Sequence, residues 1–404
     1  MRSAIAAVLA TLLAGCLTPP TGKDPGGGGT DGPPGTDGGG GDVDGGGGGP
    51  WPPADVQIHA AAAVDLDGDG KEELLVVADT GGQIELVALD GPTDVRSRAT
   101  LAGASAPFAV RGFDARMAVA GSDVIVAYTD GGAVSLDAHA GADLARLTKV
   151  ATGLAPAGAH DVWLADVEFV TGSHHAVVHA GGNLRHVRGD TLASGSPTAE
   201  MIPPPAGGWM MAQAAGSYDD AGTQRIAVAT AASFQTSPLP GPGGGAFDWA
   251  TPRTGASWSA QQVVDLDGDR RPEVFGTTAG GGSTNLCASD VDAGAQGCAS
   301  VGFPVTATLA VGDVTTDAKL DVVAGSSTGA MTHVAVRGGL VYTPGTLTTD
   351  PEVSIDVPIT EGLVVIANRG VAHEVILTVG TDGAIDCRVE MGMALIPCGP
   401  AAGF

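Results

Sequence analysis

The chain has 404 residues, of which 45 are acidic and 19 are basic, so its formal net charge is −26. This charge excludes nucleic acid and anionic lipid surfaces as good partners and favours cations. Aromatic residues make up only 4% of the chain, whereas glycine occurs 65 times. A core must therefore be built mainly from Val, Leu, Ile and Ala.

The first residues indicate export. Arg2 precedes an apolar run over 4–12, which is too short for a bilayer that needs about 20 apolar residues and is typical of a secretory signal. The string Leu13-Ala14-Gly15-Cys16 resembles the lipobox of bacterial lipoproteins. The resemblance implies cleavage before Cys16 and a membrane anchor of lipid on that residue; an ordinary cleaved signal is the alternative. Because Leu17 follows, and not aspartate, the resemblance favours an outer membrane lipoprotein that faces the periplasm or the cell surface.

A glycine-rich segment follows the signal. Sixteen of the 28 residues over 22–49 are glycine, and such a composition cannot bury apolar surface, so we expect a disordered tether. The chain therefore divides into a signal peptide over 1–15, a lipidated cysteine with its linker over 16–53, and a folded domain over 54–404.

The four remaining cysteines form two pairs with the same spacing. Cys287 and Cys298 are eleven residues apart, and so are Cys387 and Cys398. In an exported protein this spacing predicts two local disulfides, each worth about 3 kcal/mol in the chain-entropy account. A metal site would require histidines or closer cysteine pairs nearby.

A strand–turn–strand pattern recurs about every fifty residues. In the first copy, residues 74–78 and 84–87 flank a Gly-Gly turn at 81–82, as in a tight hairpin. Further copies begin near residues 124, 176, 226, 274, 322 and 364, the last two out of period. Each unit has room for four short strands, and no stretch shows helical periodicity. The sequence therefore predicts an all-β fold, a seven-bladed β-propeller, with six or eight blades as alternatives.

Two acidic loops occupy equivalent places four repeats apart. They consist of Asp65, Asp67, Asp69, Lys71 and Glu73, and of Asp265, Asp267, Asp269, Arg271 and Glu273. Four carboxylates and the main-chain carbonyl of the Lys or Arg would form the oxygen cage that Ca²⁺ prefers. We therefore predict two structural calcium sites, with solvated Asx-turns as the alternative. A weaker candidate is formed by Asp313, Thr315, Asp317 and Asp321, and a more degenerate copy by Ser217, Asp219, Ala221 and Arg225.

These loops differ from an EF-hand, because Val76 and Gly276 stand where its last glutamate would be. They resemble the FG-GAP, or VCBS, repeat of integrin α-subunit propellers and bacterial surface proteins, in which the loop joins two strands of a blade and binds calcium. The chain departs from that family in its Phe-Gly and Gly-Ala-Pro signatures. Arg270 also replaces the usual glycine, which predicts strain or weaker binding in the second loop. The resemblance implies a binding or scaffold module at the cell envelope, with protein or glycan as its ligand.

Three further motifs point only weakly to chemistry. Residues 325–329 match Gly-x-Ser-x-Gly, but a strand is expected after them where a nucleophile elbow has a helix. His174, His175, His179 and His186 form a cluster in which His175 and His179 would share a strand face, as a zinc pair or as a polar face. Asp166 and Glu168 are a possible carboxylate pair.

No catalytic constellation emerges from these motifs, so we predict a module that is not an enzyme. The alternative is an envelope enzyme that acts on polysaccharide at one face of the propeller. A charged, aromatic-lined pocket would favour the enzyme, whereas a shallow face rich in Gly and Ala would favour the module.

Overall fold

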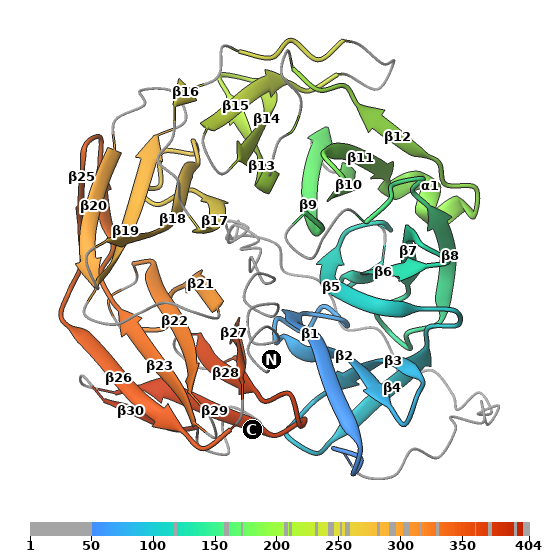
Figure 1. Ribbon diagram of the computed structural model, residues 1–404, viewed down its shortest axis with the longest axis horizontal. Coiled ribbons are helices and arrows are strands. Elements are labelled where there is room, and N and C mark those ends of the chain that lie inside the picture. The colour runs from blue at the N-terminus through green and yellow to red at the C-terminus, as the bar shows by residue number, and fades with distance from the viewer. Residues whose placement is uncertain are drawn as a thin grey trace, which may run out of the picture.

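The chain forms a ring of radially arranged antiparallel sheets (Figure 1). The structure is a computed structural model that describes residues 51–398 apart from 117–118, 157–160, 171–172, 206–208, 210–211, 231–232, 241–245, 251–252, 255–258, 281–282, 291–295, 302–307, 316, 318, 329–330, 360, 371–373 and 392–393. The predicted signal peptide, Cys16 and the predicted linker up to residue 50 lie outside the described residues. Seven sheets of four strands are present in the described part of the chain, which confirms the seven-bladed β-propeller.

Each blade takes its strands from one contiguous segment, and its first strand lies nearest the centre of the ring (Figure 1). Blades 1 and 2 contain β1 (Val56–Val64), β2 (Glu73–Thr80), β3 (Ile84–Leu89), β4 (Val95–Thr100), β5 (Ser105–Phe113), β6 (Asp123–Asp130), β7 (Ala133–His139) and β8 (Arg146–Ala151). Blades 3 and 4 contain β9 (Trp163–Val170), β10 (Ser173–Ala180), β11 (Asn183–Arg188), β12 (Ala199–Ile202), β13 (Ala212–Asp220), β14 (Thr223–Thr230), β15 (Ser233–Pro238) and β16 (Arg253–Thr254). Blade 5 contains β17 (Ser259–Val264), β18 (Glu273–Gly280), β19 (Ser283–Asp290) and β20 (Gln296–Val301). Blades 6 and 7 contain β21 (Thr308–Gly312), β22 (Asp321–Thr328), β23 (Met331–Arg337), β26 (Glu352–Val357), β27 (Leu363–Ala367), β28 (Val375–Val379), β29 (Ile385–Glu390) and β30 (Leu395–Pro397).

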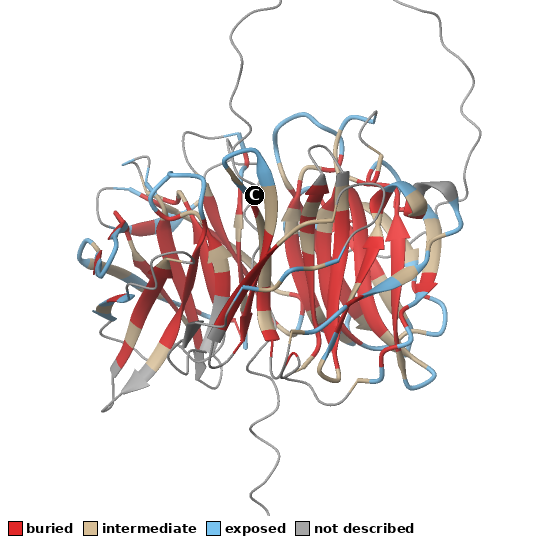
Figure 2. Ribbon diagram, turned by 90° about the horizontal axis from the view of Figure 1, so that it is seen from above, coloured by how far each residue is buried: buried red, intermediate tan, exposed pale blue. Residues whose placement is uncertain are grey.

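Apolar side chains fill the gaps between neighbouring blades, and one hydrophobic cluster of described residues lies in each of the seven gaps. In β2, Leu74 and Val76 pack toward blade 7, whereas Leu75 and Val77 pack toward blade 2. Both faces of a blade are therefore buried, which explains why the sequence shows continuous apolar runs where a half-exposed sheet would alternate. From the side, the strands are buried through most of the ring and exposed residues gather in the loops (Figure 2).

The predicted hairpins match the second and third strands of six blades, but the seventh was misplaced. Residues 364–366 belong to β27, the first strand of blade 7, and Gly370 lies in the loop before β28. The equivalent hairpin is formed by β28 and β29. Blade 6 also contains an extra hairpin, β24 (Val341–Thr343) and β25 (Thr346–Thr348), which packs on blade 5 through Tyr342 and Leu347.

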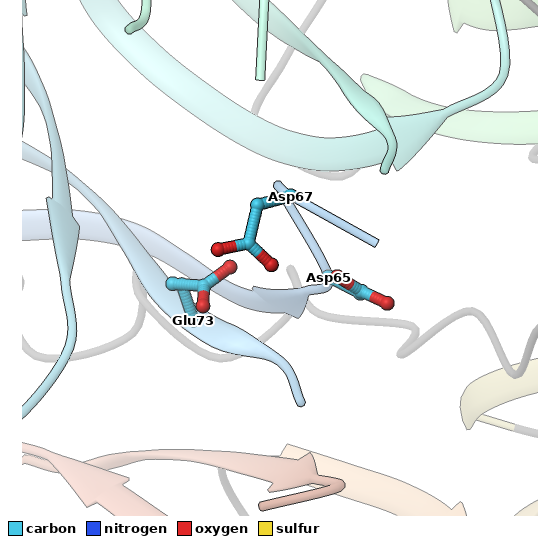
Figure 3. A group of neighbouring side chains, drawn as sticks. All are labelled: Asp65, Asp67 and Glu73. Carbon is cyan, nitrogen blue, oxygen red and sulfur yellow. The ribbon is translucent and has the colours of Figure 1, made fainter. Parts of the chain in front are cut away.

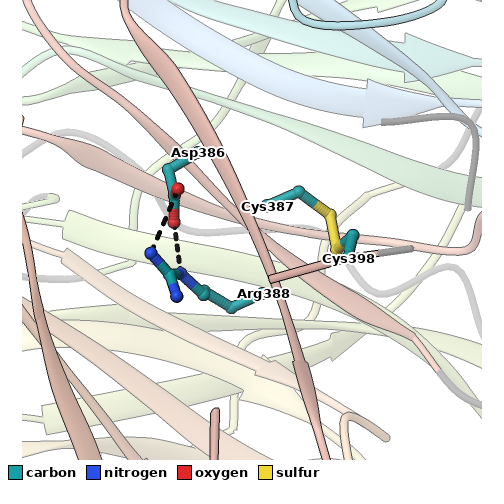
Figure 4. The surroundings of a disulfide bond; sticks show 4 residues. All are labelled: Asp386, Cys387, Arg388 and Cys398. Carbon is teal, nitrogen blue, oxygen red and sulfur yellow. Dashed lines mark hydrogen bonds and ion pairs between the residues drawn. A yellow bond between two sulfur atoms is a disulfide. The ribbon is translucent and has the colours of Figure 1, made fainter. Parts of the chain in front are cut away.

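Both predicted disulfides are present, and each joins the third strand of a blade to the fourth. Cys287–Cys298 links β19 to β20, and Cys387–Cys398 links β29 to the chain just after β30. In blade 7 the bridge lies beside the Asp386–Arg388 ion pair (Figure 4). Because β30 has only three residues, this disulfide holds a short edge strand that few hydrogen bonds would hold.

The ring is closed by contacts between blades 1 and 7 without an exchanged strand in the described chain. Trp51 packs in the cluster between the two blades, is 2% exposed, and donates a hydrogen bond from Nε1 to the carbonyl oxygen of Gly383 at 3.2 Å. Trp51 was assigned to the linker by the sequence, so the boundary at residue 54 must move back to include it. Arg369 of blade 7 donates to the carbonyl oxygens of Glu72 and Asp90 of blade 1.

The described chain contains one helix, α1 (Gly189–Ser194), at the end of β11. Among these residues no helix has the length and apolar character needed to cross a membrane.

Candidate functional site: acidic loops and the central cavity

The acidic loops all connect the first strand of a blade to the second. Because every blade repeats the same strand order, these connections lie at one face of the ring and meet around the mouth of its central channel. Hydrogen bonds show the contact directly. Ser122 N donates to Asp65 O at 2.8 Å between blades 2 and 1, and Asp313 N donates to a Glu374 carboxylate oxygen at 2.7 Å between blades 6 and 7.

The first loop curls around its own carboxylates. Asp65 accepts hydrogen bonds from the amides of Gly68 (2.7 Å) and Gly70 (3.0 Å), and both glycines have positive φ. Ligand oxygens of Asp65, Asp67 and Glu73 all lie within 4.8 Å of one another. Figure 3 shows Asp67 and Glu73 turned toward each other, with Asp65 at the side. Three of the four carboxylates proposed for this loop therefore lie together, and Asp69 is not part of this group of described residues.

The second loop has the same main-chain curl, but Asp269 takes part in its group of converging carboxylates and Glu273 does not. Asp265 accepts hydrogen bonds from Gly268 N (2.8 Å) and Arg270 N (2.9 Å), and ligand oxygens of Asp265, Asp267 and Asp269 lie within 4.8 Å of one another. Arg270 has φ of 71°, close to the 84° of Gly70. The backbone of Arg270 therefore adopts a conformation that suits glycine, so the strain expected from the sequence is present.

The glutamate that ends each loop is held from inside the blade. Leu66 N donates to Glu73 Oε2 at 2.8 Å, and Leu266 N donates to Glu273 Oε2 at the same distance. Both glutamates are nearly fully buried, at 5% and 2% exposure. Asp69 and Asp269 accept the amides of Lys71 and Arg271.

The two loops differ in their positive charge. In the first, Arg96 of β4 lies 2.9 Å from Asp67 and 3.1 Å from Glu73. In the second, the register has no counterpart of Arg96, because Arg96 lies at a bulge of β4 and β20 pairs without one. Arg271 pairs with Asp220 of blade 4. Within the described residues no Arg or Lys forms an ion pair with Glu273.

The pKa of the second Asp differs between the loops, whereas burial raises the pKa of the last glutamate in both. The hydrogen bond from Arg96 lowers the pKa of Asp67, whereas burial, followed by its acidic neighbours, raises the pKa of Asp267. Burial also raises the pKa of Glu273 to about 8, with further contributions from Asp267 and Asp265. The second loop is therefore the one whose negative charge lacks compensation, which sequence reasoning missed because Arg96 lies on another strand.

The third loop has three carboxylates, because Thr315 stands where the first loop has Asp67. Asp321 is fully buried and accepts hydrogen bonds from Val314 N, Thr315 N and Gly339 N. Burial raises its pKa to about 6. Ligand oxygens of Asp313, Asp317 and Asp321 lie within 4.8 Å of one another, while Lys319 lies 3.8 Å from Asp317. Here the amides already satisfy much of the buried charge.

In two other blades the equivalent loop has no acidic cluster among the described residues. In blade 2 the register places Asp123 where Glu73 stands, and Arg116 of the same loop pairs with it. The acidic-loop pattern did not reveal the Arg116–Asp123 pair, because this loop is longer and contains an arginine. In blade 4 the degenerate copy is a two-residue turn in which Asp219 accepts the amide of Gly222 at 2.6 Å. Asp219 therefore acts as a turn residue.

A cavity of about 180 Å³ opens at the channel mouth beside these loops. Aliphatic side chains of the first strands form much of its wall, including Ala62, Val311 and Val364, and Phe113 is its one aromatic side chain. Its polar lining includes Asp65, Glu72, Arg111, Asp114, Asp166, His174 and Glu374. His174 Nδ1 lies 2.8 Å from Asp166 Oδ2.

The other histidines do not form the zinc pair considered from the sequence. His175 and His186 place their Nδ1 atoms 3.1 Å apart and stack on Phe169, whereas His179 stacks on Trp163. Burial lowers the pKa of His175 to about 3. Residues 326–328, in the Gly-x-Ser-x-Gly string, belong to β22 and lead into β23, so they form no strand-to-helix elbow.

We predict that His175 makes the protein acid-sensitive. Because its pKa is lower in the folded than in the unfolded state, the stability that it contributes is present above pH 6.5 and is lost as pH falls toward 3. The loss should reach about 2 kcal/mol by pH 5. His175→Leu should flatten the slope of the unfolding free energy between pH 7 and pH 5, measured in urea, whereas His333→Leu, at a partly exposed position of β23, should keep it. Equal slopes in the wild type and His175→Leu would contradict this.

Comparisons with known proteins add only to the description of the fold. No family model and no curated protein matches the chain. The chain is similar to dihydro-heme d1 dehydrogenase NirN, with 13% identity and a TM-score of 0.45. The match covers 84% of this chain and 64% of NirN, so the chain spans less than two thirds of NirN. It is also similar to a putative 6-phosphogluconolactonase from Bacteroides fragilis (15% identity, TM-score 0.49, 81% and 94% covered) and to the Dos1 propeller (7% identity, TM-score 0.47, 86% and 85% covered). These likenesses are too distant to indicate a function.

Proposed function

We propose that this chain is a lipid-anchored β-propeller, stabilised by calcium, that serves as a non-enzymatic binding or scaffold module at the cell envelope. The observation that carries the calcium part is the repetition of one carboxylate loop at the same place in three blades. A protein or glycan ligand and an FG-GAP or VCBS origin are parts of the same proposal.

The donor set supports calcium. Each full loop offers carboxylates and a main-chain carbonyl, which are hard oxygen ligands. Asp65, Asp67, Asp69, Glu73 and the carbonyl of Lys71 would hold the first ion. Asp265, Asp267, Asp269, Glu273 and the carbonyl of Arg271 would hold the second. All of them come from one short loop, so an ion there would brace the turn between two strands.

We further propose that the second loop binds calcium more tightly than the first, which reverses the order expected from Arg270 alone. Strain at one positive φ costs about 1–2 kcal/mol, and Arg270 already has this φ in the folded loop. Arg96, by contrast, competes directly for Asp67 and Glu73. Calorimetric titration of the calcium-free protein tests the proposal: binding at two or more sites is expected, and absence of binding at millimolar calcium would refute it.

The lining of the cavity favours a module over an enzyme. Polysaccharide enzymes hold sugar rings on aromatic faces, and Phe113 is the one aromatic side chain among the lining residues. Ala, Val and Ile side chains form most of the apolar part of the walls. We therefore place the enzyme second among the functions proposed.

Lipid anchoring can be tested separately. Cells fed an alkyne fatty acid should label the wild-type protein, because Cys16 would carry acyl chains, and should not label Cys16→Ser. The Cys16→Ser protein should also be absent from the membrane fraction, where the wild-type protein is expected. Label on both proteins would end the lipoprotein proposal without touching the calcium sites.

A further inference from the structure

The central cavity carries more negative charge than its surroundings compensate. Five carboxylates line it, against Arg111 and His174 as the basic groups, so an excess of three negative charges remains when all are ionised. The carboxylates come from the loops and first strands of blades 1, 2, 3 and 7; they are Asp65, Glu72, Asp114, Asp166 and Glu374.

Among these carboxylates, Asp166 most clearly lacks a hydrogen-bond donor for one of its oxygens. Its side chain is 9% exposed, and its Oδ1 is buried without a hydrogen-bond partner, while Oδ2 faces His174. A buried oxygen of this kind costs free energy unless a donor reaches it. Asp114 adds negative charge close by, since it raises the pKa values of both Asp166 and His174.

The arrangement does not suit a metal ion. A divalent cation needs several oxygens around one point, and the groups of three described residues whose ligand atoms lie within 4.8 Å of one another are all in the acidic loops. The cavity carboxylates are instead spread around an aliphatic wall that includes Ala61, Ala63 and Val365. Such a site suits a ligand with an apolar body and a charged head.

We propose that the cavity binds a small organic cation, a primary ammonium on an aliphatic body, with Asp166 Oδ1 and Asp114 as the acceptors of the ammonium. The aliphatic part would lie on the walls formed by β1 and β27. Because Oδ1 of Asp166 is closed to solvent, the carboxylate would turn toward the cavity to accept a charge-assisted hydrogen bond from the ammonium. This site goes beyond the proposed function. The two sites share Asp65, but the ammonium acceptors Asp166 and Asp114 are not among the proposed calcium ligands.

The test uses butylammonium as the probe and butanol as its uncharged match, with the full-length protein at constant ionic strength and binding followed by ligand-observed NMR. Butylammonium should bind and butanol should bind at least tenfold more weakly. Asp166→Asn should weaken butylammonium by about tenfold or more, because it removes one charged acceptor. Asp114→Asn should act in the same direction and decides the matter if Asp166→Asn does not fold.

Asp356→Asn is the matched control, because Asp356 forms a similar, exposed contact with His333 at 2.9 Å between β23 and β26, away from the cavity. It should bind butylammonium as the wild type does. Equal binding of butylammonium and butanol would overturn the proposal, and so would equal weakening by Asp356→Asn and Asp166→Asn. Repeating the titration in calcium and in EDTA separates this result from the calcium proposal, since cavity binding should persist in both.

Discussion

Removal of calcium with EDTA should lower the melting temperature of the protein by about 10 °C, since an ion at a hundredfold excess over its Kd stabilises the folded state by about 2.7 kcal/mol per site. Magnesium should restore little of this, because it gives up its water reluctantly. Differential scanning calorimetry at fixed pH measures both effects.

Two matched variants show which loop is responsible. Glu273→Gln should lose much of the calcium response, yet in EDTA it should be at least as stable as the wild type, because burial raises the pKa of Glu273 to about 8 and the neutral amide avoids that cost. Glu73→Gln should be destabilised in both buffers, because it breaks the ion pair with Arg96. If Glu273→Gln keeps the full calcium shift, the second loop is not the principal site.

Trp51→Ala should cost about 3–5 kcal/mol, as expected for deleting a buried tryptophan. Its ring fills the core between blades 1 and 7, and the seam between them has no shared strand. Hydrogen exchange should therefore rise first in β1 and β27, while blade 4 stays protected. Urea unfolding gives the free energy.

Trp249→Ala is the control for this variant. Trp249 also donates from Nε1 to a carbonyl oxygen, that of Pro203 at 2.9 Å, but it is only partly buried at the outside of blades 3 and 4. Its loss should cost clearly less and should leave exchange in β1 unchanged. An equal cost for both variants would mean that the seam has no special role in stability.

Features that depend on residues close in sequence were predictable. The carboxylates of Asp65, Asp67 and Glu73 converge because one short loop carries them, and Cys387 and Cys398 pair because two adjacent strands present them. The number of blades followed from the recurring hairpin, although the seventh copy was misplaced.

Features that depend on contacts between strands or blades were not predictable. Arg96 reaches Asp67 from 29 residues away, and nothing in the spacing of charges marks it. The central cavity draws its lining from the first strands and loops of five blades, so its carboxylates are scattered along the chain. Trp51 follows a run of glycines and looks like linker until blade 7 is packed against it.

A ring closed without an exchanged strand has no privileged starting point. Each sheet is complete within its own stretch of chain, so opening the covalent chain between any two blades and joining the old ends at the Trp51–Gly383 seam would break no sheet hydrogen bond. For the same reason a whole blade could be duplicated or lost in a single genetic event without leaving an unpaired strand behind. The differences among the seven first loops, from the full carboxylate cage of blade 1 to the two-residue turn of blade 4, are what such copies would show after drifting independently.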